Sequence, residues 1–304
     1  MIDTRNFYID GAWVAPLEGT DLPVFNPATE EPYATISLGG AADAEAAIAA
    51  ARRTFPSWSM TTPAERGEVL RAILAVYEAR AADMAEAIST EMGAPIDMAL
   101  SDQAGAGRSH LKAFIRALDA FEWQRPMRPG TEGQDLVFEA AGVAGLITPW
   151  NWPMNQVVLK VGAALAAGCT MVLKPSEIAP MSSILFAEIM HEAGVPAGVF
   201  NMVNGDGPGV GTILSSHPDI DVVSFTGSTR AGILISKAAA DTVKTVSLEL
   251  GGKSPNLVFN DTDIDAAVAR GASFCFANTG QSCNAATRMP VSYTHLRAHE
   301  TRTY

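Results

Sequence analysis

One cysteine of the chain lies in a polar loop, where a thiol could carry out nucleophilic chemistry. Cys283 belongs to the sequence Gly-Gln-Ser-Cys-Asn at 280–284, whereas Cys169 and Cys275 lie in apolar segments. A cysteine thiolate adds to carbonyl carbons and forms covalent acyl intermediates. A free cysteine among apolar residues is typically a small buried side chain. The sequence therefore favours Cys283 as the nucleophile and predicts that the other two cysteines are structural.

A carboxylate upstream of this loop could serve the second half of such a reaction. Glu249 opens the sequence Glu-Leu-Gly-Gly-Lys at 249–253. A carboxylate acting as a general base can activate the water that releases an acyl group from cysteine. The five histidines fall on expected helices and turns or close to the end of the chain. This placement argues against a cysteine–histidine hydrolase.

A third segment combines a side-chain amide with two prolines and two tryptophans. It reads Thr-Pro-Trp-Asn-Trp-Pro at 148–153. Proline fixes the backbone φ angle, so this loop is rigid. The amide of Asn151 is a suitable hydrogen-bond donor to an oxyanion that forms during acyl transfer. The alternative for the tryptophans is packing in the hydrophobic core.

Two short segments are suited to a phosphate-containing cofactor. In Thr226-Gly-Ser-Thr229, Gly227 permits close backbone approach, and Ser228 can cap a helix whose free N–H groups face a phosphate. An ordinary strand–turn–helix junction has the same pattern. Lys174 and Glu177 leave one strand end together and could hold the two hydroxyls of a ribose. A solvated ion pair is the alternative for these two residues.

A glycine-rich segment at 205–211 lacks the spacing of the dinucleotide-binding fingerprint. A flexible start of a helix explains it at least as well as a phosphate site, and Gly207 remains a candidate for contact with a cofactor. The sequence contains no P-loop, and no run of residues has the spacing of metal ligands. We therefore expect no metal site.

The elements that must position these residues follow two patterns. Short strands and turns are expected over the first 35 residues, and then an Ala-rich helical layer that includes a helix capped by Thr62 with Pro63 at its first position. From Val143 the chain alternates short apolar strands with helices, which predicts a doubly wound parallel α/β sheet. The expected strands are 143–147, 170–173, 199–203, 222–225, 244–250 and 256–259. The expected helices are 80–92, 95–121, 153–167, 180–193, 207–215, 228–240 and 264–277. In such sheets ligands bind at the carboxyl ends of the strands, where all three cofactor and oxyanion segments would meet.

Composition excludes several classes of partner. The net charge of −12 argues against nucleic acid and anionic membranes, because both attract clustered cations. The longest uncharged stretch, 140–159, is interrupted by prolines and amides, and the first residues lack the apolar core of a signal peptide. Three cysteines without a pairing pattern fit a reducing compartment. We therefore expect a cytoplasmic protein.

Five motifs in order resemble the NAD(P)-dependent aldehyde dehydrogenase superfamily over about residues 7–289. They are Thr148-Pro-Trp-Asn-Trp-Pro, Leu173-Lys-Pro-Ser-Glu, Phe225-Thr-Gly-Ser-Thr, Leu248-Glu-Leu-Gly-Gly-Lys and Gly280-Gln-Ser-Cys. The resemblance implies that Cys283 attacks an aldehyde, that Asn151 binds the oxyanion and that Glu249 activates water, giving a carboxylic acid. It implies that Lys160 helps to order the site.

The same resemblance assigns the cofactor contacts. Trp150, Gly227 and Ser228 match positions at the pyrophosphate, while Thr226 and Leu250 match positions near the nicotinamide. Lys174 and Glu177 match positions on the adenine ribose. Because Glu177 would repel a 2′-phosphate, NAD is favoured and NADP stays possible.

The resemblance also divides the chain into domains. It implies an NAD-binding domain at 1–121 and 141–250, strands of an oligomerisation flap at 122–140, and the start of a catalytic domain at 251–289. The full-length form would be a homodimer or homotetramer that acts on a small-molecule aldehyde. Residues 290–304 depart from the family pattern, so we expect a truncation, a frameshift or a joining error there and an inactive or weakly active chain. A CoA-acylating enzyme, against which Glu249 argues, and a non-catalytic NAD-binding module are the alternatives.

Overall fold

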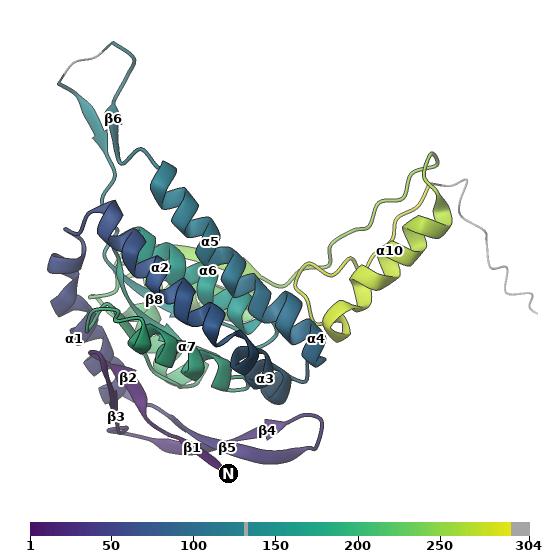
Figure 1. Cartoon of the computed structure of the whole chain (residues 1–304), viewed down its shortest axis with the longest axis horizontal. Coiled ribbons are helices and arrows are strands. Elements are labelled where there is room, and N and C mark those ends of the chain that lie inside the picture. The colour runs from purple at the N-terminus through teal and green to yellow at the C-terminus, as the bar shows by residue number, and fades with distance from the viewer. Residues whose placement is uncertain (131–132, 293–304) are drawn as a thin grey trace, which may run out of the picture. The chain divides into compact units, whose positions relative to one another are not determined.

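A computed structural model describes residues 1–130 and 133–292. The chain forms two compact units, one from Met1 to Glu249 and one that begins at Leu250. The elements of both units are labelled in Figure 1. The departure from the family pattern expected at 290–304 lies largely outside the described residues.

The first unit begins with the expected short strands. They are β1 (Ile2–Thr4), β2 (Phe7–Ile9), β3 (Ala12–Val14), β4 (Thr20–Asn26) and β5 (Glu31–Leu38). Strands β1, β5 and β4 form a separate three-stranded sheet, while β2 and β3 extend the edge of a larger sheet. The prediction of strands and turns in this region is confirmed.

A helical layer follows. Its members are α2 (Pro63–Ala79), α3 (Ala81–Met92), α4 (Ile96–Met98), the π-helix η1 (Ala99–Ala104) and α5 (Gly105–Ala120), whereas α1 (Ala41–Trp58), which precedes them, packs on strands of the larger sheet. Thr62 caps α2 as predicted, because its hydroxyl accepts a hydrogen bond from the Glu65 N–H at 3.2 Å. The single helix predicted over 95–121 is wrong in one respect, since η1 interrupts it. Apolar spacing does not reveal a π turn, which adds one residue to a helical turn.

The larger sheet has the predicted parallel, doubly wound arrangement. Its elements are β8 (Val143–Ile147), α6 (Pro153–Ala166), β9 (Thr170–Lys174), α7 (Met181–Glu192), β10 (Phe200–Met202), η2 (Gly207–Gly211), α8 (Thr212–Ser216), β11 (Val222–Gly227), α9 (Thr229–Ala240) and β12 (Thr245–Leu250). The strand order is β12-β11-β8-β9-β10-β2-β3, and β11, β8, β9 and β10 run parallel. The helix predicted at 207–215 divides into η2 and the short α8, because Gly207, Pro208 and Gly209 disfavour a regular helix there.

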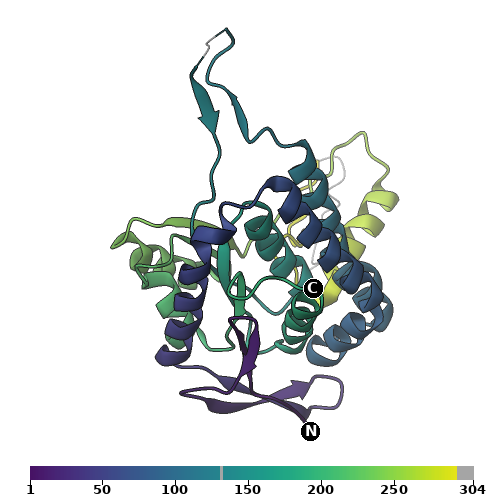
Figure 2. The ribbon, with the colours of Figure 1, turned by 60° about the vertical axis from the view of Figure 1, so that its left-hand side comes forward.

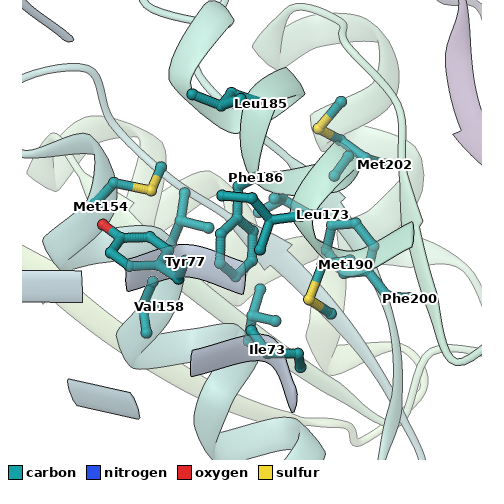
Figure 3. Close-up of a cluster of buried hydrophobic side chains, with 14 of the residues drawn as sticks. Ile73, Tyr77, Met154, Val158, Leu173, Leu185, Phe186, Met190, Phe200 and Met202 are labelled. Atoms are coloured by element: carbon teal, nitrogen blue, oxygen red, sulfur yellow. The ribbon is translucent and has the colours of Figure 1, made fainter. Parts of the chain in front are cut away.

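Aromatic and sulfur-containing side chains fill the core between the helical layer and this sheet. Figure 3 shows Tyr77, Phe186 and Phe200 clustered with Met154 and Met190. The rings of Tyr77 and Phe186 are edge to face with centroids 6.3 Å apart. The Tyr77 hydroxyl satisfies its hydrogen-bonding need by donating to the Ala104 carbonyl of η1 at 2.9 Å. The core therefore fixes η1 against α2.

The segment expected as flap strands forms a hairpin. Strands β6 (Gln124–Pro126) and β7 (Asp135–Val137) pair antiparallel in a sheet of their own, visible apart from the larger sheet in Figure 2. Met127, Leu136 and Val137 leave apolar surface exposed on it. An oligomerisation role for this hairpin stays a prediction.

The second unit contains α10 (Ile264–Phe276) and the short 3₁₀ segment η3 (Ala277–Gly280). Asp263 caps α10, as its carboxylate accepts from the N–H of Asp265 at 3.0 Å. The strand predicted at 256–259 is wrong, because only isolated bridges join Pro255 to Arg288 and Val258 to Val291. A strand needs a continuous ladder, which these single pairings do not supply.

Candidate active site

The loops that follow three neighbouring strands meet at one edge of the larger sheet. Ile147 of β8 pairs in register with Lys174 of β9 on one side and with Phe225 of β11 on the other. The carboxyl ends of these parallel strands therefore lie side by side. The Thr148 N–H donates to the Lys174 carbonyl at 3.1 Å and ties two of the loops together. This is the edge where the sequence predicted a ligand.

A cavity of about 530 Å³ opens beside the ends of β8 and β11. Residues from η2, α8 and α9 complete its walls, and Gly207 is among them. The lining is mostly apolar, and among the described residues Arg230 is the only charged one in it. The cavity is large enough for a heterocyclic ring with part of its sugar. Gly207, for which the sequence left two explanations open, thus borders a space that a ligand could fill.

Lys174 and Glu177 form an ion pair next to this cavity. Their Nζ and Oε2 atoms are 3.2 Å apart, and Nζ also donates to the Pro175 carbonyl at 2.8 Å. Lys174 is buried, and burial lowers the pKa of its ammonium group, while Glu177 acts in the opposite direction. A Cβ atom at Gly211, a residue of the cavity wall, would lie 3.8 Å from Lys174 Cδ. The pair is therefore held in place at the rim and keeps a carboxylate turned partly to solvent.

The junction of β11 and α9 has the predicted cap. The Ser228 hydroxyl accepts from the Ala231 N–H at 3.2 Å, which makes Ser228 the N-cap of α9. A Cβ atom at Gly227 would come within 2.5 Å of the Phe225 ring, so only glycine fits without displacement. The positive end of a helix dipole at this edge favours an anion.

Two buried hydroxyls at the same edge have no hydrogen-bond partner within the described part of the chain. They belong to Thr226 at the end of β11 and to Thr148 at the end of β8. Buried polar atoms are nearly always paired in native proteins, so unpaired ones often mark a place for water or a ligand. Thr226 is a predicted site residue, whereas Thr148 was overlooked, although it stands at the end of a predicted strand.

Lys160 lies under this edge on α6. Its side chain is buried, and Nζ donates to the hydroxyl of Ser224 on β11 at 2.8 Å. Burial lowers the pKa of Lys160 to about 8, and the carboxylate of Glu249 on β12 opposes this by attraction. The structure therefore brings two predicted site residues, Lys160 and Glu249, into electrostatic contact. Ser224 was not predicted, because its partner is distant in the sequence.

Asn151 lies half-buried in the loop between β8 and α6. Its backbone carbonyl accepts a hydrogen bond from Gln103 Nε2 of η1 at 3.2 Å. Trp150 is 36% exposed, so it does not pack in the core. Gln103 was not predicted either, because no motif links η1 to this loop.

Cys283 and Leu250 belong to the second unit. Cys283 is an exposed free thiol, whereas Cys169 of the first unit is buried as predicted and Cys275 is half-buried. The turn before Cys283 is strained, since Asn278 and Thr279 both have left-handed backbone conformations with φ of 52° and 59°. Non-glycine residues in this conformation cost about 1–3 kcal/mol each and concentrate at functional sites.

Within the same unit, the Gly-Gly segment packs against the nucleophile loop. A Cβ atom at Gly252 would lie 3.2 Å from the Cys283 carbonyl oxygen. The backbone at Gly252 therefore lies close to the backbone of the cysteine loop.

Two kinds of feature, a metal-binding cluster and a membrane-spanning helix, are absent from the described residues. These residues contain no group of three or more His, Cys, Asp or Glu side chains arranged to hold a metal ion. None of the helices over these ranges has both the length and the apolar character to cross a membrane.

The chain is similar to known proteins of one family. The sequence matches the Aldehyde dehydrogenase family over residues 13–298. It is 52% identical to a 3-succinoylsemialdehyde-pyridine dehydrogenase of a Pseudomonas species, over 97% of this chain and 61% of that protein. Its fold matches the crystal structure of an aldehyde dehydrogenase from Bartonella henselae with a TM-score of 0.95 and 57% identity, over 97% of this chain and 62% of that one.

A second solved structure is a cysteine-to-alanine mutant of aldehyde dehydrogenase C from Pseudomonas syringae, in complex with NAD+ and octanal. It has a TM-score of 0.93 and 48% identity, over 96% of this chain and 59% of that one. The chain thus spans about three-fifths of the length of the relatives it matches. The motifs, the sheet and these matches together show that the chain belongs to the aldehyde dehydrogenase family.

Proposed function

We propose that the protein carrying this chain oxidises a small-molecule aldehyde to the carboxylic acid with NAD+. The observation that carries this proposal is the cavity at the carboxyl edge of the sheet, bordered by Gly207 and flanked by the Lys174–Glu177 pair and the start of α9. Its parts have the chemistry that an adenosine, its ribose and a pyrophosphate require. The free cysteines support a reducing compartment such as the cytoplasm.

The residues of the first unit would each hold one part of the cofactor. The apolar cavity would hold the adenine, Glu177 would accept hydrogen bonds from the ribose hydroxyls, and Lys174 would donate to the same sugar. The N-terminus of α9, with Gly227 and Ser228, receives the pyrophosphate beside Trp150. Thr226, with its unpaired buried hydroxyl, and Leu250 would border the nicotinamide. The carboxylate of Glu177 favours NAD over NADP, because a 2′-phosphate would place like charges together.

The chemical steps belong to Cys283, Asn151 and Glu249. The thiolate of Cys283 attacks the aldehyde carbon, and the Asn151 amide with the Cys283 N–H stabilises the resulting oxyanion. A bound NAD+ would supply the acceptor for the hydride that leaves as this oxyanion collapses to a thioester. Glu249 then removes a proton from water, which hydrolyses the thioester to the acid. Lys160, whose pKa burial lowers to about 8, still carries most of its positive charge at physiological pH, where it attracts the Glu249 carboxylate.

The names of two relatives indicate the class of aldehyde that the protein could oxidise. One is named for a pyridine-bearing semialdehyde and another was crystallised with octanal.

We propose that residues 1–121 and 141–250 form the NAD-binding domain, that 251–289 open a catalytic domain and that the hairpin within 122–140 joins subunits into a dimer or tetramer. The 304-residue chain by itself is proposed to bind NAD and to be inactive or weakly active.

The cofactor part of the proposal can be tested on the chain as it is. NAD and NADP are titrated while the fluorescence of tryptophan is followed, because Trp150 is exposed at the site. NAD binds more tightly than NADP, and Glu177→Gln weakens NAD and strengthens NADP by about tenfold each, or about 1.4 kcal/mol. Glu86→Gln on the exposed face of α3 is the matched control and leaves both affinities unchanged. A chain that binds neither dinucleotide contradicts the proposal.

A further inference from the structure

We propose that Gln103 is a positioning residue that fixes the Asn151 peptide and thereby the amide that stabilises the oxyanion. This inference rests on the proposed function, in which Asn151 is the oxyanion donor. Gln103 lies outside the motifs by which the sequence resembles its family. Its role follows from the contacts of one buried side chain and from the backbone that holds it.

The Gln103 side chain is fully buried, with 0% of its surface exposed. Its Nε2 atom donates to the Asn151 carbonyl at 3.2 Å and lies 3.4 Å from the Met92 sulfur, a weak acceptor. Its Oε1 atom has no partner in the described part of the chain. A buried acceptor without a partner is destabilising, so an apolar residue of the same length would suit packing better. The hydrogen bond to Asn151 is the strong interaction that only the amide provides.

The backbone under Gln103 is unusually well fixed. Gln103 lies in the π-helix η1, and the next carbonyl, that of Ala104, accepts a hydrogen bond from the buried Tyr77 hydroxyl at 2.9 Å. Short π-helical segments within helices occur frequently at functional sites. They change the direction of side chains relative to a continuous α-helix. A hydrogen-bond donor on a fixed backbone restricts the position of its acceptor more than a donor on a mobile surface residue could.

Gln103 contacts the middle of the loop between β8 and α6. The loop begins with the Thr148 N–H on the Lys174 carbonyl, and α6 begins with the Gln156 N–H on the Trp152 carbonyl. The contact from Gln103 falls between these two anchors, on the residue that carries the oxyanion donor. A rotation of this peptide would move the Asn151 amide away from the oxyanion. Catalytic donors tolerate displacements of only about 0.5 Å.

The activity test is a double-mutant cycle in a protein that continues this chain with the C-terminal part its relatives possess. Gln103→Met keeps the length of the side chain and removes the N–H donor. It lowers kcat by about ten- to hundredfold, as a misplaced catalytic group does, and leaves the affinity for NAD within about twofold. In an Asn151→Ala background the same substitution costs less than about twofold, because the group it positions is absent.

Met92→Leu is the matched control, because it removes the sulfur contact of Gln103 and leaves the bond to Asn151 intact. It leaves kcat within about twofold. An equal loss from Gln103→Met in both backgrounds, or no loss in either, overturns the inference. If Asn151→Ala itself leaves kcat unchanged, the oxyanion role in the proposed function fails as well. A loss for Asn151→Ala without a loss for Gln103→Met refutes the role of Gln103 alone.

A second measurement needs no activity and uses the 304-residue chain itself. Amide hydrogen exchange is compared between the wild type and Gln103→Met in peptides that cover 148–156 and in peptides that cover α7. The substitution speeds exchange at 148–156 by about fivefold or more, the change expected for a loss of about 1 kcal/mol of local stability. Exchange in α7 stays the same. Unchanged exchange at 148–156 contradicts the inference even where activity is lost for another reason.

Discussion

Replacing Lys160 by methionine is expected to stabilise the first unit at neutral pH, although it removes a proposed site residue. The Lys160 side chain is 8% exposed, and its pKa of about 8 lies below the ordinary value of 10.5. At about 1.4 kcal/mol per pH unit, this difference is a cost of about 3 kcal/mol for the buried charge. Loss of the hydrogen bond to Ser224 offsets about 1 kcal/mol, so the net gain is about 2 kcal/mol.

The lowered pKa of Lys160 determines how the free energy of unfolding changes with pH. Between pH 8 and 10.5 the unfolded chain binds a proton that folded Lys160 has released, so the free energy of unfolding rises with pH in this window. Below pH 8 the folded state carries the full cost of the buried ammonium group. The stabilisation by Lys160→Met is therefore complete below pH 8 and disappears as pH approaches 10.5.

Thermal unfolding of the two proteins at pH 7 and at pH 10 measures both predictions. A gain of about 2 kcal/mol raises the Tm by about 4–8 °C at pH 7 for a unit of this size, with little change at pH 10. Lys237→Met, on the exposed face of α9, is the matched control and changes the Tm at neither pH. A pH-independent change, or a lower Tm at pH 7, would refute the claim that burial dominates the energy of Lys160.

Further predictions concern the cysteines and the glycine of the cofactor edge. In the native chain a thiol reagent labels Cys283 first and Cys169 last, because Cys283 is exposed and Cys169 is buried. Labelling followed by peptide mass spectrometry checks the order. Preferential reaction of Cys169 contradicts the prediction. Gly227→Ala weakens NAD binding and destabilises the first unit by about 1–3 kcal/mol, because the added Cβ would lie 2.5 Å from the Phe225 ring. Calorimetric titration and unfolding measure the two effects, with Gly251→Ala, where a Cβ meets open space, as the control that should change neither.

The sequence predicted best those features that depend on neighbouring residues. Ser228 caps a helix through the N–H of Ala231, three positions away, and Lys174 pairs with Glu177, also three positions away. The residue types and their spacing are therefore enough to predict both interactions. Alternation of apolar strands with helices predicted the parallel sheet, because burial on both faces leaves a clear pattern. The meeting of the three loops at one edge then followed from the topology.

The features that the sequence did not predict depend on contacts between distant segments. Gln103 reaches Asn151 across 48 positions and Ser224 reaches Lys160 across 64. The residues around Gln103 and Ser224 in the sequence show no pattern that would predict these partners. The π-helix η1 and the missing strand at 256–259 are of the same kind, because tertiary packing and strand pairing decide them and apolar spacing does not.

The central claim is that Cys283 carries the acyl group of an oxidised aldehyde, and trapping that group tests it most directly. A protein that continues this chain with the C-terminal part of its relatives is prepared with Glu249→Gln, which removes the base for hydrolysis. It is incubated with an aldehyde in the presence or absence of NAD+, and the masses of its peptides are measured by mass spectrometry. We predict an acyl adduct on the Cys283 peptide that forms only with NAD+. Acid formation without any adduct on Cys283, or an adduct on Cys169 or Cys275 instead, would contradict the account.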